Sequence, residues 1–245
     1  MAGIVLGIDV GGSSIKGGIV DVEAGRLVGE LATIPTPRPA APEPMMRAIA
    51  KLAATMPATD AVGLAFPTVV QGRKARTAAH IDPSWLGVDG AALAETALGR
   101  RAVFLNDADA AGIAEMRWGA GRGLKDVVIM LTFGTGIGTA LFADGKLFPN
   151  TELGHLELHG LDAEEWASAR IRTQLGLDWP AWIARVNEYL ARMHTLFWPD
   201  TFILGGAVSE RFAEFAPHLH SLAQIRPAQF TGQAGVIGAA LAAAS

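Results

Sequence analysis

The sequence predicts an α/β protein of two related domains with a substrate cleft between them. Two glycine-rich turns of the same kind, DVGGSSIKGG at residues 9–18 and TFGTGIGT at residues 132–139, lie far apart in the 245-residue chain. Each turn is set between runs of β-forming residues. Helical patterns alternate with further strands after both turns, as in α/β folds. The repeat predicts residues 1–106 plus 232–245 as a small N-terminal domain and residues 107–231 as a large C-terminal domain.

In the first half, the apolar run at residues 4–8 predicts a buried strand that enters the first glycine turn. Prolines crowd residues 35–44, so we expect a rigid connector there and no helix. Residues 45–56 have helical periodicity, and Pro67 ends the strand expected at residues 61–65. The same patterns predict strands at residues 15–20, 26–34 and 102–105, and helices at residues 91–98 and 110–118.

The second half repeats this order. Residues 127–133 predict a strand into the second glycine turn, and residues 139–142 pair back with it. Polar residues alternate with leucines over residues 150–159, which predicts a half-buried strand. The small residues at 235–244 predict a helix that packs close to another backbone. The remaining elements are strands at residues 146–148 and 202–204, and helices at residues 163–174, 179–198 and 209–220.

Composition limits the classes of function. Half of the residues are apolar and 18% are charged, which is typical of an ordered globular protein, and the net charge of −4 argues against a nucleic-acid partner. The absence of cysteine excludes disulfides and thiolate zinc sites. No apolar run approaches the ~18 residues of a membrane span, and the N-terminus lacks the basic region of a signal peptide. We therefore expect a cytoplasmic protein with no membrane partner.

The two glycine turns are candidate anion-binding sites, because glycine lets backbone N–H groups approach an anion with no Cβ in the way. Neither turn is a Walker loop, and the second departs from the G-x-G-x-x-G pattern because Thr139 stands at its last position. A lone turn of this kind is usually only a hairpin. Two turns at matching positions, each with hydroxyl side chains beside it, favour a phosphotransferase that holds a phosphate chain.

Two carboxylates stand where phosphoryl transfer needs them. Asp9 directly precedes the first turn, where it would repel phosphate, so its natural role is to hold Mg²⁺ or a water that bridges phosphate oxygens. Asp107 follows Asn106 at the end of a strand and can act as general base for a substrate hydroxyl. An Asp after a strand is also a common turn residue or helix cap, and Asp109 is either a competing base or the cap of the helix expected from residue 110.

A polar segment follows the second turn. This segment offers several acceptors and one tunable donor, which suits a polyhydroxylated ligand such as a sugar; the residues are Glu152, His155, Glu157 and the nearby Glu164. The spacing of His155 and His159 also fits a metal site, but without cysteine such a site needs further His or carboxylate ligands. The alternative is a solvated strand edge whose carboxylates pair with arginines. Of the tryptophans, we place only Trp85 near the cleft and most others in the core.

These motifs together resemble the ROK family of sugar kinases, whose fold is actin/hexokinase-like (ribonuclease H-like). The most specific likeness is LTFGTGIG at residues 131–138 followed by NTELGH at residues 150–155. Within the family, the chain resembles the polyphosphate glucokinases, and many such enzymes are homodimers. Further matching segments are residues 8–21, 63–87, 105–123, 196–210 and 235–242.

The resemblance implies a role for each candidate residue. Asp107 would be the catalytic base that acts on the sugar 6-hydroxyl, and Asp9 would lie near Mg²⁺. The sugar hydroxyls would be bound by Asn106, Glu152, His155 and Glu164. The phosphate channel would be lined by Gly11, Gly12, Lys16, Thr132, Gly134, Thr135 and Gly136.

The chain also departs from the family pattern. Most ROK proteins have a cysteine-rich zinc motif after the Glu-x-Gly-His segment, whereas DAEEWAS stands here at residues 162–168, as in the polyphosphate-using group, so no zinc is expected. His80 replaces the usual Asn of a sugar-side loop, and Thr68 follows Pro67 where many members have Gly, so we expect an effect on sugar preference. The DNA-binding domain of ROK repressors is not expected, because the chain starts at its first phosphate strand.

Three functions fit these observations. The first is phosphoryl transfer from inorganic polyphosphate, with ATP as a further donor, to the 6-hydroxyl of glucose, with mannose as a second sugar. The second is a strictly ATP-dependent hexose or amino-sugar kinase, since a long polyphosphate favours a basic groove and this chain is acidic overall. The third is a sugar-binding regulator without catalysis, against which Asp9, Asp107 and both turns argue. A basic patch would draw on Lys16, Arg73, Lys74, Arg76, Arg122 and Lys125.

Overall fold

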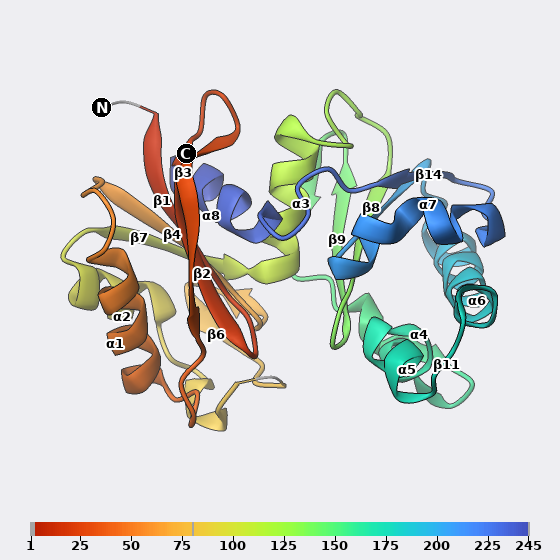
Figure 1. The fold of residues 1–245 in the computed structure, drawn as a ribbon, viewed down its shortest axis with the longest axis horizontal. Helices are drawn as coiled ribbons and strands as arrows, with labels where there is room; N and C mark the ends of the chain where they lie inside the picture. Colours follow the sequence, from red (N-terminus) through yellow and green to blue (C-terminus); the bar gives the residue numbers. More distant parts are fainter. Residues whose placement is uncertain (1–2, 80, 245) are drawn as a thin grey trace. The chain divides into compact units, whose positions relative to one another are not determined.

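Residues 3–79 and 81–244 are described by a computed structural model, in which the chain divides into two compact units (Figure 1). Unit 1 comprises residues 1–114 and 233–245, and unit 2 comprises residues 115–232. In the described part of the chain, each unit is built around one five-stranded sheet. None of the described helices combines the length and the apolar character that crossing a lipid bilayer requires.

The sheet of unit 1 joins an antiparallel meander to parallel strands. Its order is β3 (Arg26–Pro35), β2 (Ser14–Asp21), β1 (Ile4–Val10), β4 (Ala61–Phe66) and β7 (Arg101–Asn106). β1 pairs antiparallel with β2 and parallel with β4, and β4 pairs parallel with β7. The other elements are α1 (Pro42–Ala53), α2 (Gly90–Leu98), the first part of α3 (Asp107–Trp118), α8 (Ala234–Ala244), the strands β5 (Val70–Gln71) and β6 (Lys74–Ala75), and the turn η1 (Pro83–Trp85).

The sheet of unit 2 has the same topology, so the predicted repeat is confirmed. Its order is β10 (Lys146–Phe148), β9 (Ile137–Ala143), β8 (Val128–Phe133), β13 (Thr201–Gly205) and β14 (Gln224–Pro227). β8 pairs antiparallel with β9 and parallel with β13. The other elements are η2 (Leu153–His155), β11 (Glu157–Leu158), β12 (Leu161–Asp162), α4 (Ala163–Ala167), α5 (Ala169–Gln174), α6 (Trp179–Phe197), η3 (Ala207–Arg211), α7 (Phe212–Phe215) and η4 (Ala216–His218).

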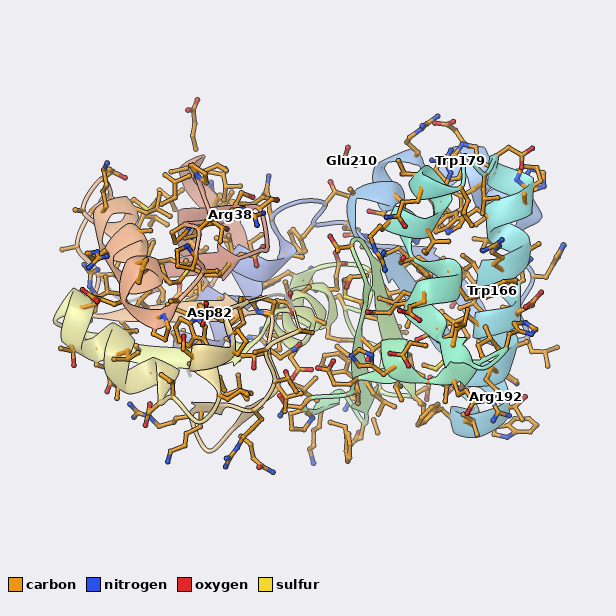
Figure 2. All side chains as sticks on the ribbon, turned by 90° about the horizontal axis from the view of Figure 1, so that it is seen from below. Arg38, Asp82, Trp166, Trp179, Arg192 and Glu210 are labelled. Atoms are coloured by element: carbon orange, nitrogen blue, oxygen red, sulfur yellow. The ribbon has the colours of Figure 1, made fainter. Side chains whose placement is uncertain are left out.

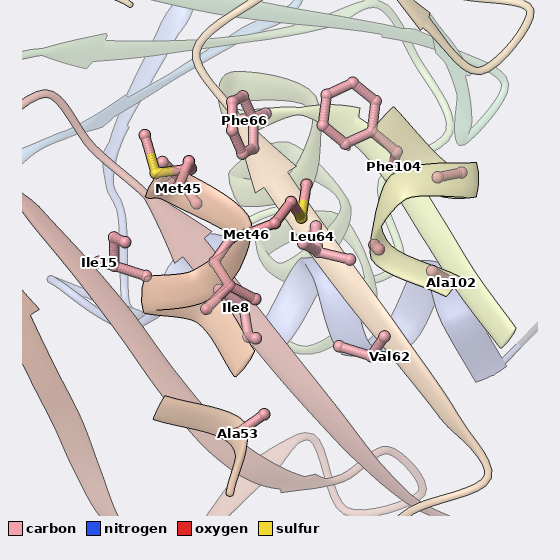
Figure 3. Close-up of a cluster of buried hydrophobic side chains, with 14 of the residues drawn as sticks. Ile8, Ile15, Met45, Met46, Ala53, Val62, Leu64, Phe66, Ala102 and Phe104 are labelled. Atoms are coloured by element: carbon pink, nitrogen blue, oxygen red, sulfur yellow. The ribbon is translucent and has the colours of Figure 1, made fainter. Parts of the chain in front are cut away.

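Each unit has its own hydrophobic core on one face of its sheet. In unit 1, alternate residues of β1 and β4, among them Ile8 and Leu64, are buried in one cluster with side chains of α1 and α2 (Figure 3). In unit 2, Leu131 and Phe202 from the strands pack with Trp182 and other residues of α6. The site residues therefore belong to two separately packed scaffolds.

Helix α8 packs backbone to backbone against the other face of the unit 1 sheet. A Cβ on Gly7 or Gly63 would overlap a carbonyl oxygen of α8, and a Cβ on Gly238 would overlap the carbonyl oxygen of Ala110 in α3. Glycine allows these approaches because it has no side chain. The predicted close packing of a small-residue helix is confirmed, and it fixes α8 against both β1 and the start of α3.

A buried carboxylate fixes the end of α3 within unit 2. Glu115 is fully buried, and its oxygens accept hydrogen bonds from the backbone N–H groups of Ala120 (2.8 Å), Gln229 (2.8 Å) and Phe230 (2.7 Å). Backbone donors of this kind satisfy a buried carboxylate with charge-assisted bonds. They tie the end of α3 to the segment that leads from β14 toward α8.

Two helices begin earlier than predicted. Helix α1 begins at Pro42, inside the connector where no helix was expected, because proline fits the first helical turn, where its missing N–H needs no partner. Helix α3 begins at Asp107, because the side chain of Asn106 accepts a hydrogen bond from the N–H of Asp109 at 3.0 Å. Asn106 is therefore the cap, and the prediction that Asp109 caps a helix from residue 110 is wrong.

Three segments of the second half are less regular than predicted. Over residues 150–159 the expected strand is replaced by η2 and the two-residue β11. The helix expected over residues 163–174 is broken at Ser168, whose backbone is extended and whose side chain caps α5. The helix expected over residues 209–220 consists of three short turns, because Pro217 has no N–H for a continuous helix.

Trp85 belongs to the core of unit 1, so its indole has no exposed face on which a sugar could stack. The side chain is fully buried, and its ring centroid lies 4.6 Å from that of Phe66 and 6.3 Å from that of Phe104. The indole N–H donates to the carbonyl oxygen of Ala40 at 2.9 Å. The predicted loop around Trp85 is present, and the buried indole anchors it to the core.

We expect Gly63→Ala to lower the free energy of unfolding by about 1–3 kcal/mol, because its Cβ would overlap the backbone of α8. Urea unfolding followed by circular dichroism measures this change. Gly12→Ala is the matched control: no described atom lies within 4 Å of a Cβ at Gly12, so we expect a change below about 0.5 kcal/mol. Equal stability of the two variants would contradict the close approach of α8.

Candidate active site

The predicted site residues fall into two groups, one in each unit, and each group is described within its own unit. Unit 1 holds Asp9, Gly11, Gly12, Lys16, Asn106 and Asp107. Unit 2 holds Thr132, Gly134, Thr135, Gly136, Glu152, His155 and Glu164.

In unit 1, the carboxyl ends of the parallel strands bring Asp9 and Asn106 to one edge of the sheet. Asp9 is in register with Ala65 of β4, and Ala65 is in register with Leu105 of β7. Asn106, the next residue, ends β7. Ligands of open α/β sheets commonly bind outside the carboxyl ends of the strands, which makes this edge the candidate site of unit 1.

The first glycine turn is fixed by hydrogen bonds to its carbonyl groups. The N–H of Gly11 donates to the carbonyl oxygen of Ser14 at 2.9 Å. Thr36 holds the turn from the start of the next loop, because its hydroxyl donates to the carbonyl oxygen of Gly11 at 2.6 Å and its N–H to that of Ser13 at 3.1 Å. No described atom lies within 4 Å of a Cβ built on Gly12. The backbone at Gly12 is therefore open to an approaching anion.

Asp9 lies between two positive groups. Lys16 is its partner in the antiparallel register of β1 and β2. Its carboxylate also contacts the first turn of α8, since a Cβ on Gly235 would lie 2.6 Å from Cγ of Asp9, and a helix N-terminus carries partial positive charge. Burial raises the pKa of Asp9, and the charge of Lys16 lowers it to a smaller extent. The oxygens of Asp9 are ligands of the type that Mg²⁺ prefers.

Asn106 and Asp107 lie where β7 passes into α3. Asn106 is buried, and its Nδ2 donates to the carbonyl oxygen of Thr68 at 3.2 Å while its Oδ1 caps α3. One amide hydrogen of Asn106 is left for a ligand. Asp107 is the first residue of the helix, and its Oδ1 accepts from the N–H of Ala108 at 2.9 Å. The backbone thus orients the carboxylate, as a general base requires.

A cavity of about 270 Å³ lies beside the first turn. Arg38 and Asp82 contribute opposite charges to its wall, and both are labelled in unit 1 in Figure 2. Arg38 is exposed and Asp82 is half-buried, so water screens both charges. Its lining residues are Gly12, Pro37, Arg38, Pro39, Ala40, Ile81 and Asp82.

The second glycine turn is fixed by Arg170, a residue that sequence reasoning missed. Within the turn, the N–H of Gly134 donates to the carbonyl oxygen of Gly136 at 3.0 Å. The N–H of Arg170 donates to the carbonyl oxygen of Gly134 at 3.1 Å, and its Nε donates to that of Thr135 at 3.0 Å. A cation at the start of α5 therefore lies directly against the predicted phosphate turn.

Glu164 joins the second turn to the Glu-x-Gly-His segment. Its Oε2 accepts from the N–H of Ile137 at 3.2 Å, and a Cβ on Gly136 would overlap that oxygen. A Cβ on Gly154 would overlap the carbonyl oxygen of Ile137. Close approach to the backbone thus requires glycine at position 154, whereas a Cβ at position 136 would displace the carboxylate end of Glu164. The structure brings together Glu164 and Gly136, which were predicted for the sugar and the phosphate respectively.

His155 lies among carboxylates. Its Nδ1 is 2.8 Å from Oδ2 of Asp162, and its Nε2 is 3.8 Å from Oε2 of Glu152. The hydrogen bond to Asp162 is the main cause of a raised pKa for His155. Burial raises the pKa of Glu152, the charge of His155 lowers it, and the charge of Glu164 raises it further. This group can both donate hydrogen bonds to hydroxyl groups and accept them, as sugar binding requires.

Metal binding by the histidines is not supported by their contacts. His155 pairs with Asp162, and His159 pairs with Glu188 at 2.7 Å. Among residues 3–79 and 81–244, no three His, Asp or Glu side chains gather into a group that would hold a metal ion. Mg²⁺ needs no such group, because it keeps several waters and is commonly bound by one or two carboxylates together with substrate phosphates.

Three further residues were singled out from the sequence, one for a basic patch and two for sugar preference. Arg73, predicted for a basic patch, forms ion pairs with Asp89 (3.4 Å) and Glu95 (2.7 Å), which compensate its charge. Thr68 is buried, and its hydroxyl donates to the carbonyl oxygen of Thr77 at 2.7 Å. Because the carbonyl oxygen of Thr68 accepts the hydrogen bond from Nδ2 of Asn106, the buried Thr68 helps to hold Asn106 in place. His80 lies outside the described residues.

Sequence reasoning missed Thr36, Arg170 and Asp162. Thr36 stands in the proline-rich connector, where no motif marks it. Arg170 follows the second turn by more than thirty residues, and only the tertiary fold brings it back. Asp162 had a signal, because it opens the segment that replaces the expected zinc motif.

Comparisons with known proteins identify the family of this chain and its relatives. The sequence model of the ROK family matches residues 5–170. A polyphosphate glucokinase of Mycobacterium tuberculosis is 42% identical over 237 residues, which cover 96% of this chain and 89% of the relative.

Solved structures show the same likeness. An inorganic polyphosphate/ATP-glucomannokinase from Arthrobacter sp. strain KM matches with a TM-score of 0.94 and 45% identity, over 99% of this chain and 98% of that chain. A ROK family glucokinase from Streptomyces griseus, in complex with glucose and AMPPNP, matches with a TM-score of 0.84 and 26% identity, over 98% and 99% of the two chains. The predicted hexokinase-like fold is confirmed, and the chain belongs to the ROK family.

Proposed function

We propose that this chain transfers a phosphoryl group from inorganic polyphosphate, and also from ATP, to the 6-hydroxyl of glucose, giving glucose 6-phosphate. The observation that carries the proposal is the 42% identity to a polyphosphate glucokinase over 96% of the chain. The carboxylates and the glycine turn within each unit support it, because each part of a phosphotransferase site has a residue of suitable chemistry.

Asp107 is the general base of this reaction. The oxygen of the sugar 6-hydroxyl attacks phosphorus, and its proton passes to the carboxylate of Asp107 as the bond to the donor breaks. The first turn of α3 orients this carboxylate through Ala108, and the neighbouring Asn106 offers one amide hydrogen to the sugar. Glu152, His155 and Glu164 complete the set of proposed sugar ligands.

The donor phosphates are bound at both turns by the backbone N–H groups that the turns do not use themselves, because the N–H groups of Gly11 and Gly134 donate to the carbonyl oxygens of Ser14 and Gly136. The proposed phosphate ligands are Gly11, Gly12, Lys16, Thr132, Gly134, Thr135 and Gly136. Backbone donors explain how a chain of net charge −4 holds a polyanion without a large excess of basic side chains. Lys16 opposite Asp9 and Arg170 against Thr135 add local positive charge in their respective units.

Asp9 is the proposed Mg²⁺ ligand. It is a partly buried carboxylate at the end of β1, beside the glycine turn, and Mg²⁺ binding through a single carboxylate and waters fits this donor set. When bound, Mg²⁺ would neutralise charge on the phosphate oxygens.

Two observations extend the proposal. The 45% identical Arthrobacter protein is a glucomannokinase, which supports mannose as a second sugar. We also propose a homodimer, as the resemblance to the polyphosphate glucokinases implies; unit 2 exposes the apolar side chains of Leu196, Trp198 and Leu222 to 46%, 72% and 87%. Localisation in the cytoplasm, where sugars and polyphosphate meet, completes the proposal.

The second candidate is a strictly ATP-dependent hexose kinase. The observation that favours it is the 26% identical Streptomyces griseus glucokinase, which was crystallised with AMPPNP. A non-catalytic sugar-binding regulator is the remaining alternative, and the presence of Asp9, Asp107 and both glycine turns opposes it.

We expect glucose 6-phosphate from both donors when the protein is incubated with glucose, Mg²⁺ and either polyphosphate or ATP at equal phosphate concentration. Coupled measurement of glucose 6-phosphate gives the two rates. Product from ATP alone would replace the proposal by the second candidate. Glucose binding without product from either donor would favour the regulator.

We expect Asp107→Asn to lower turnover by a factor of roughly 100 to 10,000, because the amide cannot accept the proton of the sugar hydroxyl. Glucose binding, measured by calorimetry, should remain. Asp144→Asn, which removes an exposed carboxylate between β9 and β10, is the matched control and should keep wild-type turnover. Turnover near wild type in Asp107→Asn would show that Asp107 is not the base.

We expect Arg170→Ala to raise the KM for polyphosphate roughly tenfold, because a cation that holds the second turn is lost. The KM for glucose should change little. Arg192→Ala is the control: Arg192 is exposed on α6 and forms no ion pair or hydrogen bond with the described residues (Figure 2). An equal KM for polyphosphate in both variants would remove Arg170 from the donor site.

A further inference from the structure

The imidazole of His155 is held from one side by a carboxylate on a separate element. His155 ends η2, whereas Asp162 ends the short strand β12. Their contact joins Nδ1 of His155 to Oδ2 of Asp162 at 2.8 Å, which is the distance of a strong hydrogen bond. Because Nδ1 is occupied by Asp162, Nε2 is the nitrogen left to meet a ligand.

The hairpin that carries Asp162 is itself anchored at its other end. Nε2 of His159, at the turn between β11 and β12, lies 2.7 Å from Oε2 of Glu188 on α6. The same oxygen accepts a hydrogen bond from Nε1 of Trp166 at 3.2 Å, and the guanidinium of Arg185 lies 4.0 Å from the centre of that indole. Asp162 therefore projects from a hairpin fixed to the core helix of unit 2, so its position is defined independently of His155.

The charged groups around His155 all favour its protonated form. Asp162 faces it from β12, Glu152 from the residue before η2, and Glu164 from α4. The hydrogen bond to Asp162 raises the pKa of His155, partial burial lowers it, and the charges of Glu164, Asp162 and Glu152 raise it further.

We propose that Asp162 is a positioning residue that fixes both the orientation and the charge of His155, so that Nε2–H is presented as a hydrogen-bond donor to a sugar hydroxyl. The inference rests on the proposed function, in which His155 binds the sugar. With Nδ1–H donated to Asp162, a neutral imidazole would offer only an acceptor at Nε2, whereas the imidazolium offers a charge-assisted donor.

The expected pH dependence of sugar binding has a defined direction. The donor form is present at pH values below the pKa of His155 and is lost as the pH rises through it. Because Asp162 raises the pKa of His155, the protonated donor form persists to higher pH. Removing its charge should therefore make sugar binding weaken at a lower pH than in the wild type.

Two substitutions separate charge from orientation. Asp162→Asn keeps an oxygen that accepts from Nδ1–H and removes the negative charge, whereas Asp162→Ala removes both. Glu165→Gln is the matched control, because it removes an exposed carboxylate three residues away that forms no ion pair or hydrogen bond with the described residues. The measurements are the KM for glucose as a function of pH, and the ¹⁵N shifts of the His155 ring as a function of pH with and without glucose.

For the wild type and Glu165→Gln, we expect the KM for glucose to rise only at high pH. In Asp162→Asn the rise should start at lower pH and reach roughly tenfold at neutral pH, while kcat changes far less. Asp162→Ala should show the same shift together with a higher KM at every pH. The ring shifts should report a lower pKa for His155 in both variants and a change at Nε2 on glucose addition in the wild type.

The two possible failures can be told apart. If Asp162→Asn and the wild type share one pH profile and one His155 titration, the inference is wrong even when glucose is phosphorylated. A second outcome is that the titration of His155 depends on Asp162, but glucose does not change the ring shifts and the KM for glucose has the same pH profile in every variant. In that case His155 does not bind the sugar, and the inference falls together with that part of the proposed function. A uniform loss of kcat in both variants, with the titration unchanged, would assign Asp162 a purely structural role.

Discussion

The unit 1 site depends on the close approach of α8 to the sheet and to α3. Gly7, Gly63 and Gly238 allow this approach, because a side chain at any of them would overlap the backbone of the neighbouring element. The approach places the N-terminal turn of α8 against Asp9 and fixes the start of α3, from which Asp107 projects. A side chain at any of the three positions would overlap a backbone carbonyl oxygen, so α8 would have to move away from the sheet or from α3.

The two halves repeat one sheet topology but fix their glycine turns differently. The first turn is held by a neutral residue, Thr36, which leaves Lys16 and Asp9 to set its charge. The second turn is held by Arg170 on one side and Glu164 on the other. The repeat therefore supplies a common sheet topology, whereas the side chains that fix the glycine turn and set the charge beside it differ between the two units.

Much of the fold could be predicted from the sequence, because alternation of apolar residues and glycine turns are local signals. Both meanders and the position of Asp107 after a strand followed from such signals. The start of α1 and the burial of Trp85 did not, since a proline run can cap a helix and an indole in a loop can point into the core. Arg170 reaches the second turn only through the tertiary fold, which no spacing in the sequence encodes, and the contact of Asp162 with His155 depends on the pairing of β11 with β12.

The loss of the cysteine-rich motif explains why a carboxylate near His155 matters in this chain. A loop that carries a ligand-binding side chain must be held rigidly, and without a metal the rigidity has to come from packing and hydrogen bonds. Here His159, Trp166 and Glu188 bind the hairpin to α6, and the hairpin presents Asp162 to His155. A carboxylate differs from a metal ion in one consequential respect: it stabilises a protonated imidazole, whereas a metal requires an unprotonated nitrogen. A carboxylate at this position therefore favours the charged form of His155 in addition to fixing the orientation of its ring.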